Sequence, residues 1–234
     1  DLNSVRESPA GGGISLREGV AYINNNMIYQ NFSNGWGDGI EFITFWKENS
    51  RIVNNTIVDN DPHQGEGVFI AAQNSRPVFH NNLIVGHDTG ILICEKTVVD
   101  HNYNGYYDNV YNIEGDVHAG NDVQGDPCFP ARLEGNLQIR HCSVMLDKGN
   151  PDPDYFPDED FQSDARPVNG RVDIGADEMI DSPPMIELLT PNPENRACIN
   201  RFEISWIDDD PEQDATVLIM YDDDPEFGPD LELI

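Results

Sequence analysis

Two short sequence elements recur together four times between residues 13 and 109, and this repeat constrains the fold more than any other feature. The first is a glycine followed by an alternating apolar run, and the second is an asparagine followed by apolar or aromatic residues. The elements begin at Gly13, Gly39, Gly67 and Gly90, and at Asn26, Asn55, Asn82 and Asn104. Two elements that keep their order through four repeats predict a solenoid of stacked repeats.

The repeat length favours one solenoid class. Successive glycines are 26, 28 and 23 residues apart, which is too short for a four-stranded propeller blade and suits three short strands per coil. The sequence therefore predicts an all-β, right-handed parallel β-helix with about four recognisable coils. Stacked coils place like residues about 4.8 Å apart, so the apolar positions should form inward ladders. The expected ladders are Ile14, Ile40, Val68 and Ile91; Leu16, Phe42, Ile70 and Ile93; and Ile28, Ile57, Ile84 and Tyr106.

The recurring polar positions allow two interpretations. Stacked asparagine side chains at a turn could bond one another and satisfy polar groups that face the interior, and we expect such a ladder at Asn26, Asn55, Asn82 and Asn104. A second polar row could instead bind sugars, with tryptophans stacking on the rings. The glycan-binding candidates are Asn31, Asn60, His87, Asn109, Trp36 and Trp46.

The region after the repeats carries two more specific motifs. Gly125-Asp126-Pro127-Cys128-Phe129 is followed by Ser143–Asn150, and Asp173-Ile174-Gly175-Ala176-Asp177-Glu178 comes after Asp164 and Arg166. With the repeats, these motifs resemble the pectate-lyase-like superfamily of β-helix proteins, and the ending is similar to that of choice-of-anchor-type bacterial surface proteins. The resemblance implies an exported bacterial protein at the cell surface or outside the cell. It does not imply a reaction, because function depends on the site carried by the fold.

Two domains are expected. Residues 1–180 should form the β-helix, with a cap region at 116–180 that covers its open end and finishes with the Asp173–Glu178 strand. The acids of that ending, with Arg166, are interpreted as partners that stabilise the cap. Residues 181–234 follow Pro183-Pro184 and resemble the start of an immunoglobulin-like or fibronectin-like β-sandwich. Such domains need about 100 residues, so we expect a missing continuation or completion by another chain. Because the chain starts at Asp1, we expect a mature or trimmed product.

Charge excludes some functions and suggests a cation. The net charge is −30, which excludes a nucleic-acid binder, and no apolar run is long enough to span a membrane. Residues 181–234 carry 15 acids and two bases, so bound Ca²⁺ could screen them. The metal-ligand candidates are Asp208, Asp210, Asp214, Asp222 and Asp224. The alternative interpretation is solvated turns in a salt-adapted protein. We expect Ca²⁺ to raise the melting temperature through this segment.

Catalytic residues are not identified by any specific grouping. A polysaccharide lyase needs a base and a group that neutralises a uronate carboxylate, whereas a glycosidase needs two carboxylates at a defined separation. The lyase candidates are Lys47, Arg51, Arg76, Lys96, His80 and His101, and the glycosidase candidates are Asp38, Glu41 and Glu66. On the coils, Arg51 and His80 could share one face. Ordinary surface roles explain these residues more simply than catalysis does, so the sequence leans away from an enzyme.

Four cysteines allow at most two disulfides. Cys128 and Cys142 lie 14 residues apart and could close a small loop, whereas Cys94 and Cys198 have no evident mates.

The function expected from the sequence is an extracellular or cell-surface scaffold, adhesion or glycan-binding module. Its expected partner is a polysaccharide or cell-surface glycan. The first alternative is a carbohydrate-active enzyme, most plausibly a polysaccharide lyase. The second is a subunit of an extracellular polymer, associating through the solenoid end or the incomplete sandwich.

Overall fold

The computed structural model describes residues 11–45, 49–61, 65–117 and 120–180, and the backbone of residues 4–5, 185–190, 205–209, 220–221 and 232–233. The chain divides into two compact units, residues 1–180 and residues 181–234. Among the described residues, the only helical elements are two 3₁₀ turns, η1 (Arg132–Glu134) and η2 (Pro153–Tyr155). None of the described helices is long and apolar enough to cross a membrane.

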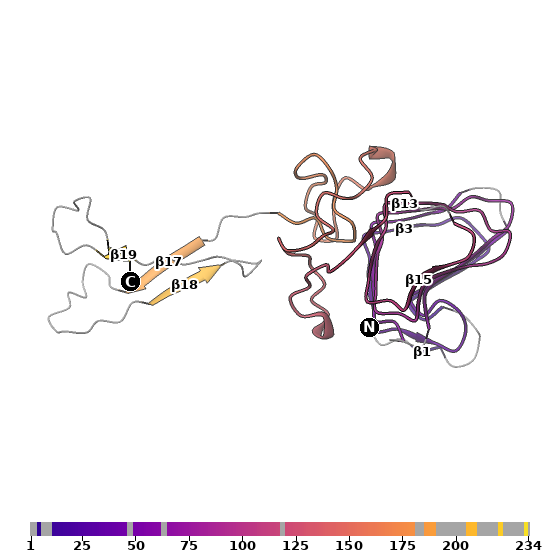
Figure 1. Ribbon diagram of the computed structural model, residues 1–234, viewed down its shortest axis with the longest axis horizontal. Coiled ribbons are helices and arrows are strands. Elements are labelled where there is room, and N and C mark those ends of the chain that lie inside the picture. Colours follow the sequence, from indigo (N-terminus) through magenta and orange to yellow (C-terminus); the bar gives the residue numbers. More distant parts are fainter. Residues whose placement is uncertain are drawn as a thin grey trace. The chain divides into compact units, whose positions relative to one another are not determined.

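Three parallel sheets wind around one core in the first unit, and Figure 1 shows their coils superposed. The first sheet contains β2 (Ile14–Arg17), β6 (Ile40–Thr44), β9 (Glu66–Ala72), β12 (Thr89–Ile93) and β15 (Tyr111–Glu114). The second contains β3 (Tyr22–Asn24), β7 (Arg51–Val53), β10 (Val78–His80) and β13 (Asp100–Asn102). The third contains β4 (Met27–Tyr29), β8 (Thr56–Val58), β11 (Leu83–Val85), β14 (Gly105–Tyr107) and β16 (Val123–Gln124). A short parallel pair, β1 (Ser4–Val5) and β5 (Phe32–Ser33), adds to this unit.

The parallel solenoid predicted from the repeats is confirmed, with about four turns. Strand register aligns Ile40 with Val68 and Val68 with Ile91 in the first sheet. In the third sheet it aligns Ile57 with Ile84. These side chains are fully buried, and burying each apolar side chain of this size stabilises the fold by roughly 1.5–3 kcal/mol.

The second sheet supplies an inward ladder that the repeats did not reveal. Its strands are three residues long, and only the middle residue points into the core. The ladder is Ile23, Ile52, Phe79 and His101. Because each strand has one inward residue flanked by two outward ones, no alternating apolar run marks it in the sequence.

The asparagine ladder is also confirmed. Asn26 Nδ2 donates to Asn55 Oδ1 at 2.9 Å, Asn55 to Asn82 at 2.9 Å, and Asn82 to Asn104 at 3.2 Å. A fifth rung replaces the amide with a carboxylate, because Asp122 Oδ1 accepts the backbone N–H of Asn104 at 2.9 Å. The solenoid therefore continues through β16, beyond the residue 116 at which we expected the cap to begin.

The position of the cap differs from the one that we expected. Residues 125–180 pack on the outer face of the third sheet instead of covering the solenoid end (Figure 1). Their buried side chains Leu137, Met145 and Ile174 meet Leu83 and Val85, which point outward from β11. The physical reason is that this outer face is itself apolar and must be covered.

A glycine on β14 allows a close approach between the cap and the third sheet. A Cβ at Gly105, on β14, would lie 2.5 Å from Met145 Sδ and 3.0 Å from Ile174 Cγ2. A side chain there would push the cap away from the sheet.

The cap is anchored along both edges of the third sheet by residues with positive φ that precede the ladder residues. At one edge, Asn54 Nδ2 donates to the carbonyls of Asp173 (3.2 Å) and Gly175 (3.1 Å). At the other edge, Arg132 donates to Asp59 Oδ2 at 2.8 Å and to Asp108 Oδ2 at 2.9 Å. The left-handed conformation turns these side chains outward, where the cap can reach them.

The Asp173–Glu178 ending is irregular and is not the final strand that we expected. The N–H of Ala176 donates to Thr56 Oγ1 at 2.9 Å, and the N–H of Gly175 donates to the Asn81 carbonyl at 2.8 Å. In a strand, the backbone N–H groups of this segment would bond to a neighbouring strand. The irregular backbone instead leaves them free to bind the buried carboxylates of the segment.

In the second unit the structure describes two antiparallel pairs. They are β17 (Met185–Thr190) with β18 (Ser205–Asp209), and β19 (Met220–Tyr221) with β20 (Glu232–Leu233). The immunoglobulin-like or fibronectin-like class of this unit stays a prediction.

Candidate functional site

The outer face of the second sheet gathers polar and aromatic side chains. Because the middle residue of each strand points inward, the first and third point outward. This places Tyr22 and Asn24 of β3 beside Arg51 and Val53 of β7, with His80 on β10. Tyr22 is 71% exposed, so its ring is accessible to a ligand on this face.

A proline-rich cap loop borders this face. Within it, the η2 turn is capped by Asp152, whose Oδ1 accepts the Asp154 N–H at 3.1 Å. The Tyr155 carbonyl accepts a bond from Asn81 Nδ2 at 3.2 Å. The Tyr155 ring stacks on His80, with centroids 4.4 Å apart, and Arg51 Cζ lies 5.7 Å from the Tyr155 centroid. These contacts fix the loop against the sheet.

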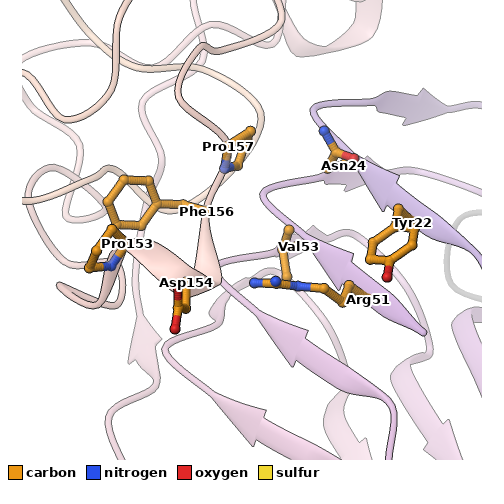
Figure 2. Close-up of a pocket in the computed structure, with 8 residues that line it drawn as sticks. All are labelled: Tyr22, Asn24, Arg51, Val53, Pro153, Asp154, Phe156 and Pro157. Atoms are coloured by element: carbon orange, nitrogen blue, oxygen red, sulfur yellow. The ribbon is translucent and has the colours of Figure 1, made fainter. Parts of the chain in front are cut away.

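Between sheet and loop lies a groove of about 280 Å³. Figure 2 shows the Arg51 side chain extending from β7 toward the loop, with the Tyr22 ring standing on the neighbouring strand. The lining residues are Tyr22, Asn24, Arg51, Val53, Pro153, Asp154, Phe156 and Pro157. The groove thus offers flat apolar surfaces, a cationic donor, an amide and a carboxylate acceptor to a hydrogen-bonding ligand.

His80 belongs to the wall of the site and not to the groove. It is only 3% exposed. Its Nδ1 lies 3.0 Å from Asn150 Nδ2, and its Nε2 lies 3.4 Å from Asp100 Oδ1. Burial lowers the pKa of His80 despite the Asp100 carboxylate. The structure therefore brings Arg51 and His80 to one face, as we expected, but only Arg51 lines the groove.

The predicted glycan-binding row lies inside the solenoid wall. Asn31, Asn60 and His87 are buried, and Asn31 Nδ2 donates to Asn60 Oδ1 at 2.9 Å. Asn60 Nδ2 lies 3.4 Å from His87 Nε2, and the His87 N–H donates to the half-buried Asn109 at 3.0 Å. This row forms a second polar ladder, parallel to the asparagine ladder, and contributes nothing to the groove.

The two predicted tryptophans lie elsewhere. Trp36 is 52% exposed and stacks on Phe69 of the first sheet, with centroids 5.0 Å apart. Trp46 lies outside the described residues, as does the lyase candidate Lys47.

Two of the three glycosidase candidates are buried. Glu41 is fully buried and accepts bonds from Ser15 Oγ (2.7 Å) and Arg17 Nη2 (2.7 Å). Asp38 is buried and accepts the Ser33 N–H at 2.7 Å, and burial raises its pKa to about 7. Glu66 Oε2 accepts the Gly37 N–H at 3.4 Å, and its charge adds to the raised pKa of Asp38. Glu41 and Asp38 therefore support the N-terminal coil.

The remaining lyase candidates cluster around a second cavity of about 490 Å³ beside β13. Its titratable lining residues are Arg76, Lys96, Asp100, His101 and Asp116. His101 is buried, with its Nε2 2.8 Å from the Tyr106 hydroxyl and its Nδ1 3.6 Å from Asp122. Burial lowers the pKa of His101 to about 4, so the ring is neutral near pH 7. The two basic and two acidic side chains that line this cavity cancel in charge, so the cavity favours neither an anionic nor a cationic ligand.

The predicted metal ligands all belong to the second unit. Asp210, Asp214, Asp222 and Asp224 lie outside the described residues, and of Asp208 only the backbone within β18 is described. Within residues 11–180, in the parts that the structure describes, no three His, Cys, Asp or Glu side chains gather as a metal site.

A buried ionic cluster at the end of the cap has the stabilising geometry that we expected. Arg166 is 6% exposed; its Nη2 donates to the Gly175 carbonyl at 3.1 Å, and its Nη1 lies 3.7 Å from Glu178 Oε2. Asp173 accepts the N–H groups of Asp147 (2.6 Å) and Met179 (2.9 Å). Burial raises the pKa of Asp173, and that of Asp177 nearby, to about 7.

These raised pKa values predict that mild acid stabilises the protein. Asp173 and Asp177 bind protons in the folded state up to about pH 7, whereas unfolded aspartates do so only up to about pH 4. The folded state therefore binds more protons, and stability falls as pH rises through this window. His80 and His101 act oppositely below about pH 6.5, where only the unfolded state gains their protons. We expect the apparent melting temperature to rise from about pH 8 to about pH 6.

Circular dichroism melts across this range test the expectation. Asp177→Asn should flatten the pH dependence, because its Oδ1 can still accept the Ile139 N–H that Asp177 binds at 2.7 Å. Asp158→Asn, at an exposed position, should leave the dependence unchanged. A melting temperature that falls between about pH 8 and about pH 6 would contradict the assignment.

Comparison with known protein families, curated proteins and solved structures finds no match to this chain.

Proposed function

We propose that this protein is an exported cell-surface or extracellular module that binds a glycan in the groove between the second sheet and the cap loop. The observation that carries the proposal is the placement of an exposed aromatic ring, Tyr22, beside the donor Arg51 and the acceptor Asp154 in one groove. Aromatic rings stack on the apolar faces of sugars, and charged hydrogen-bonding groups recognise hydroxyls strongly.

Charge favours a neutral glycan over a polyanion. The groove carries one cation and one carboxylate, while the chain as a whole carries a net charge of −30. Long-range repulsion would slow the approach of pectin-like or alginate-like chains unless cations screened it. A neutral oligosaccharide pays no such penalty and can use both Arg51 and Asp154.

Calorimetric titration with cello-, xylo-, manno- and oligogalacturonate oligosaccharides tests the proposal. For the bound neutral oligosaccharide, we expect Tyr22→Ala to weaken binding roughly tenfold, because the stacking surface is lost. Arg51→Gln should weaken it roughly 10- to 100-fold, because a charged hydrogen-bond donor is lost. Melting temperatures of both variants should stay close to that of the parent protein, since both side chains point out of the core.

Matched controls locate the site. Tyr111→Ala removes a ring that is 55% exposed on the first sheet, and Arg76→Gln removes a cation outside the groove. Both should bind like the parent. If Trp36→Ala abolishes binding while Tyr22→Ala does not, the glycan lies on the first sheet and the groove assignment is wrong. Absence of binding to every oligosaccharide would overturn the proposed function.

A lyase is the second candidate, and the shared face of Arg51 and His80 is the observation that favours it. The burial of His80 under Tyr155 counts against it, because a proton-transferring group must reach its substrate. Incubation with oligogalacturonate and alginate, with and without Ca²⁺, should give no absorbance from unsaturated products. A rise in that absorbance, lost in Arg51→Gln, would establish the enzyme instead.

A further inference from the structure

The chain leaves the solenoid and is at once held against a later part of the cap. After β16, Gly125 and Asp126 lie along Val144. The Val144 N–H donates to the Asp126 carbonyl at 3.2 Å, and a Cβ at Gly125 would lie 2.8 Å from Val144 Cγ2. The two segments are therefore in direct contact at the junction between solenoid and cap.

This contact places two thiols together. Cys128 follows Asp126 by two residues, and Cys142 precedes Val144 by two. The Cys128 N–H donates to Asp126 Oδ1 at 2.7 Å, and Cys128 has a φ of 56°, so a tight turn fixes its side chain. The two thiols are near enough to interact, because Cys142 contributes to the raised pKa of Cys128. Both are free cysteines; Cys128 is half-buried and Cys142 is exposed.

We propose that Cys128 and Cys142 form a reversible disulfide that locks the start of the cap onto the folded protein in an oxidising environment. This inference is independent of the proposed glycan binding. It rests on the backbone contact between the two segments, the tight turn at Cys128 and the accessibility of Cys142.

The exchange can be written with a small-molecule disulfide, oxidised glutathione, as the oxidant. The Cys142 thiolate, which solvent and oxidant reach more readily, attacks one glutathione sulfur and releases the other glutathione as a thiolate. The Cys128 thiol then loses its proton to solvent and attacks the Cys142 sulfur, releasing the second glutathione. Two protein thiols become one disulfide, and one glutathione disulfide becomes two reduced glutathione molecules. The pKa of Cys128 is raised to about 12, by burial first and then by Cys142, so Cys128 is the resolving partner.

The disulfide would close a loop that anchors the cap. The 15 residues from Cys128 to Cys142 include Arg132, which pairs with Asp59 and Asp108, and Leu137, which packs on the third sheet. Closing a loop of this size restricts the unfolded chain and so stabilises the folded one. The anchoring of the cap would then depend on the redox state of the surroundings.

Tryptic mapping identifies the bond directly. Cleavage after Lys96, Arg132, Arg140 and Lys148 separates Cys128, in residues 97–132, from Cys142, in residues 141–148. After equilibration of the full chain with oxidised glutathione and blocking of free thiols, we expect these peptides to be joined and to have lost two hydrogen atoms. The apparent melting temperature should rise by roughly 5 °C and return on reduction.

Two variants make the result decisive. Cys142→Ser, at an exposed position, should abolish both the joined peptide and the rise in melting temperature. Cys94→Ser should keep both, because Cys94 lies in a separate turn. The proposal is overturned if the two peptides carry glutathione or remain unmodified instead of joining, or if the joined protein melts at a lower temperature than the reduced one.

Discussion

Replacing Arg166 with methionine should lower the free energy of unfolding by roughly 3–5 kcal/mol near neutral pH. Arg166 is the cation at the centre of a buried cluster that contains Asp160, Asp173, Asp177 and Glu178. Methionine fills similar space but leaves these carboxyl groups without a counter-charge. The apparent melting temperature should fall by roughly 10 °C, measured by circular dichroism on the full chain.

The pH dependence of this loss separates charge from packing. Near pH 5 the carboxyl groups of Asp173 and Asp177 are protonated, because their pKa values are raised to about 7. Arg166→Met should therefore cost much less in mild acid than at neutral pH. Arg76→Met, at a side chain that is 61% exposed, should change stability by less than about 0.5 kcal/mol. A loss that is equal at both pH values would show that Arg166 acts by packing alone.

Replacing Asn82 with leucine should destabilise the solenoid by a similar amount, roughly 3–5 kcal/mol. Asn82 is fully buried. Its Nδ2 donates to the carbonyls of Ile52 (2.8 Å) and His80 (3.0 Å) and to Asn104 Oδ1, and its Oδ1 accepts two bonds from Asn55. Leucine removes all five of these bonds inside the wall, where water cannot replace them.

Asn82→Asp gives a sharper test of the same ladder. The carboxylate could still accept from Asn55, but it would face three acceptor oxygens that Asn82 now satisfies. The protein tolerates Asp122 at the last rung, where the carboxylate accepts from Asn104 and lies 3.6 Å from His101. We expect Asn82→Asp to be nearly as destabilising as the leucine variant near pH 7 and to recover in acid. Exposed Asn24→Ala is the matched control, and an equal loss there would show that the ladder has no special role.

Much of the fold could be predicted from the repeats, because every coil stacks on the next in the same way. A strand residue in one coil must match the residue above it, so the inward ladders and the asparagine ladder could be predicted from spacing alone. The second sheet was not predicted, because each of its three-residue strands points only one residue inward. In addition, its core ladder includes His101, which is a polar residue. Asp122 was not predicted as a rung of the asparagine ladder, because it has a carboxylate where the other rungs have an amide.

The groove could be predicted only in fragments. Arg51 was a candidate, but Tyr22, Asn24 and Asp154 carry no repeat and no motif. Tyr22 and Asp154 are 132 residues apart, and they meet because the cap folds back along the solenoid. Residues with positive φ hold the cap in this position, because their side chains point outward and bind cap groups. They are Asn54, Asp59, Asn81 and Asp108. Their only sequence signal is that each stands directly before a ladder position.

By itself, the sequence determined the parallel solenoid, its apolar ladders and its internal amide ladder, because each depends on a pattern that recurs at the period of one coil. Only the tertiary structure decided where the cap lies, that the second polar row is buried as well, and which residues share the groove. Those features depend on contacts between one unique segment and one face of the solenoid. A single contact of that kind leaves no periodicity in the chain, so it becomes visible only when the cap and the sheet are packed together.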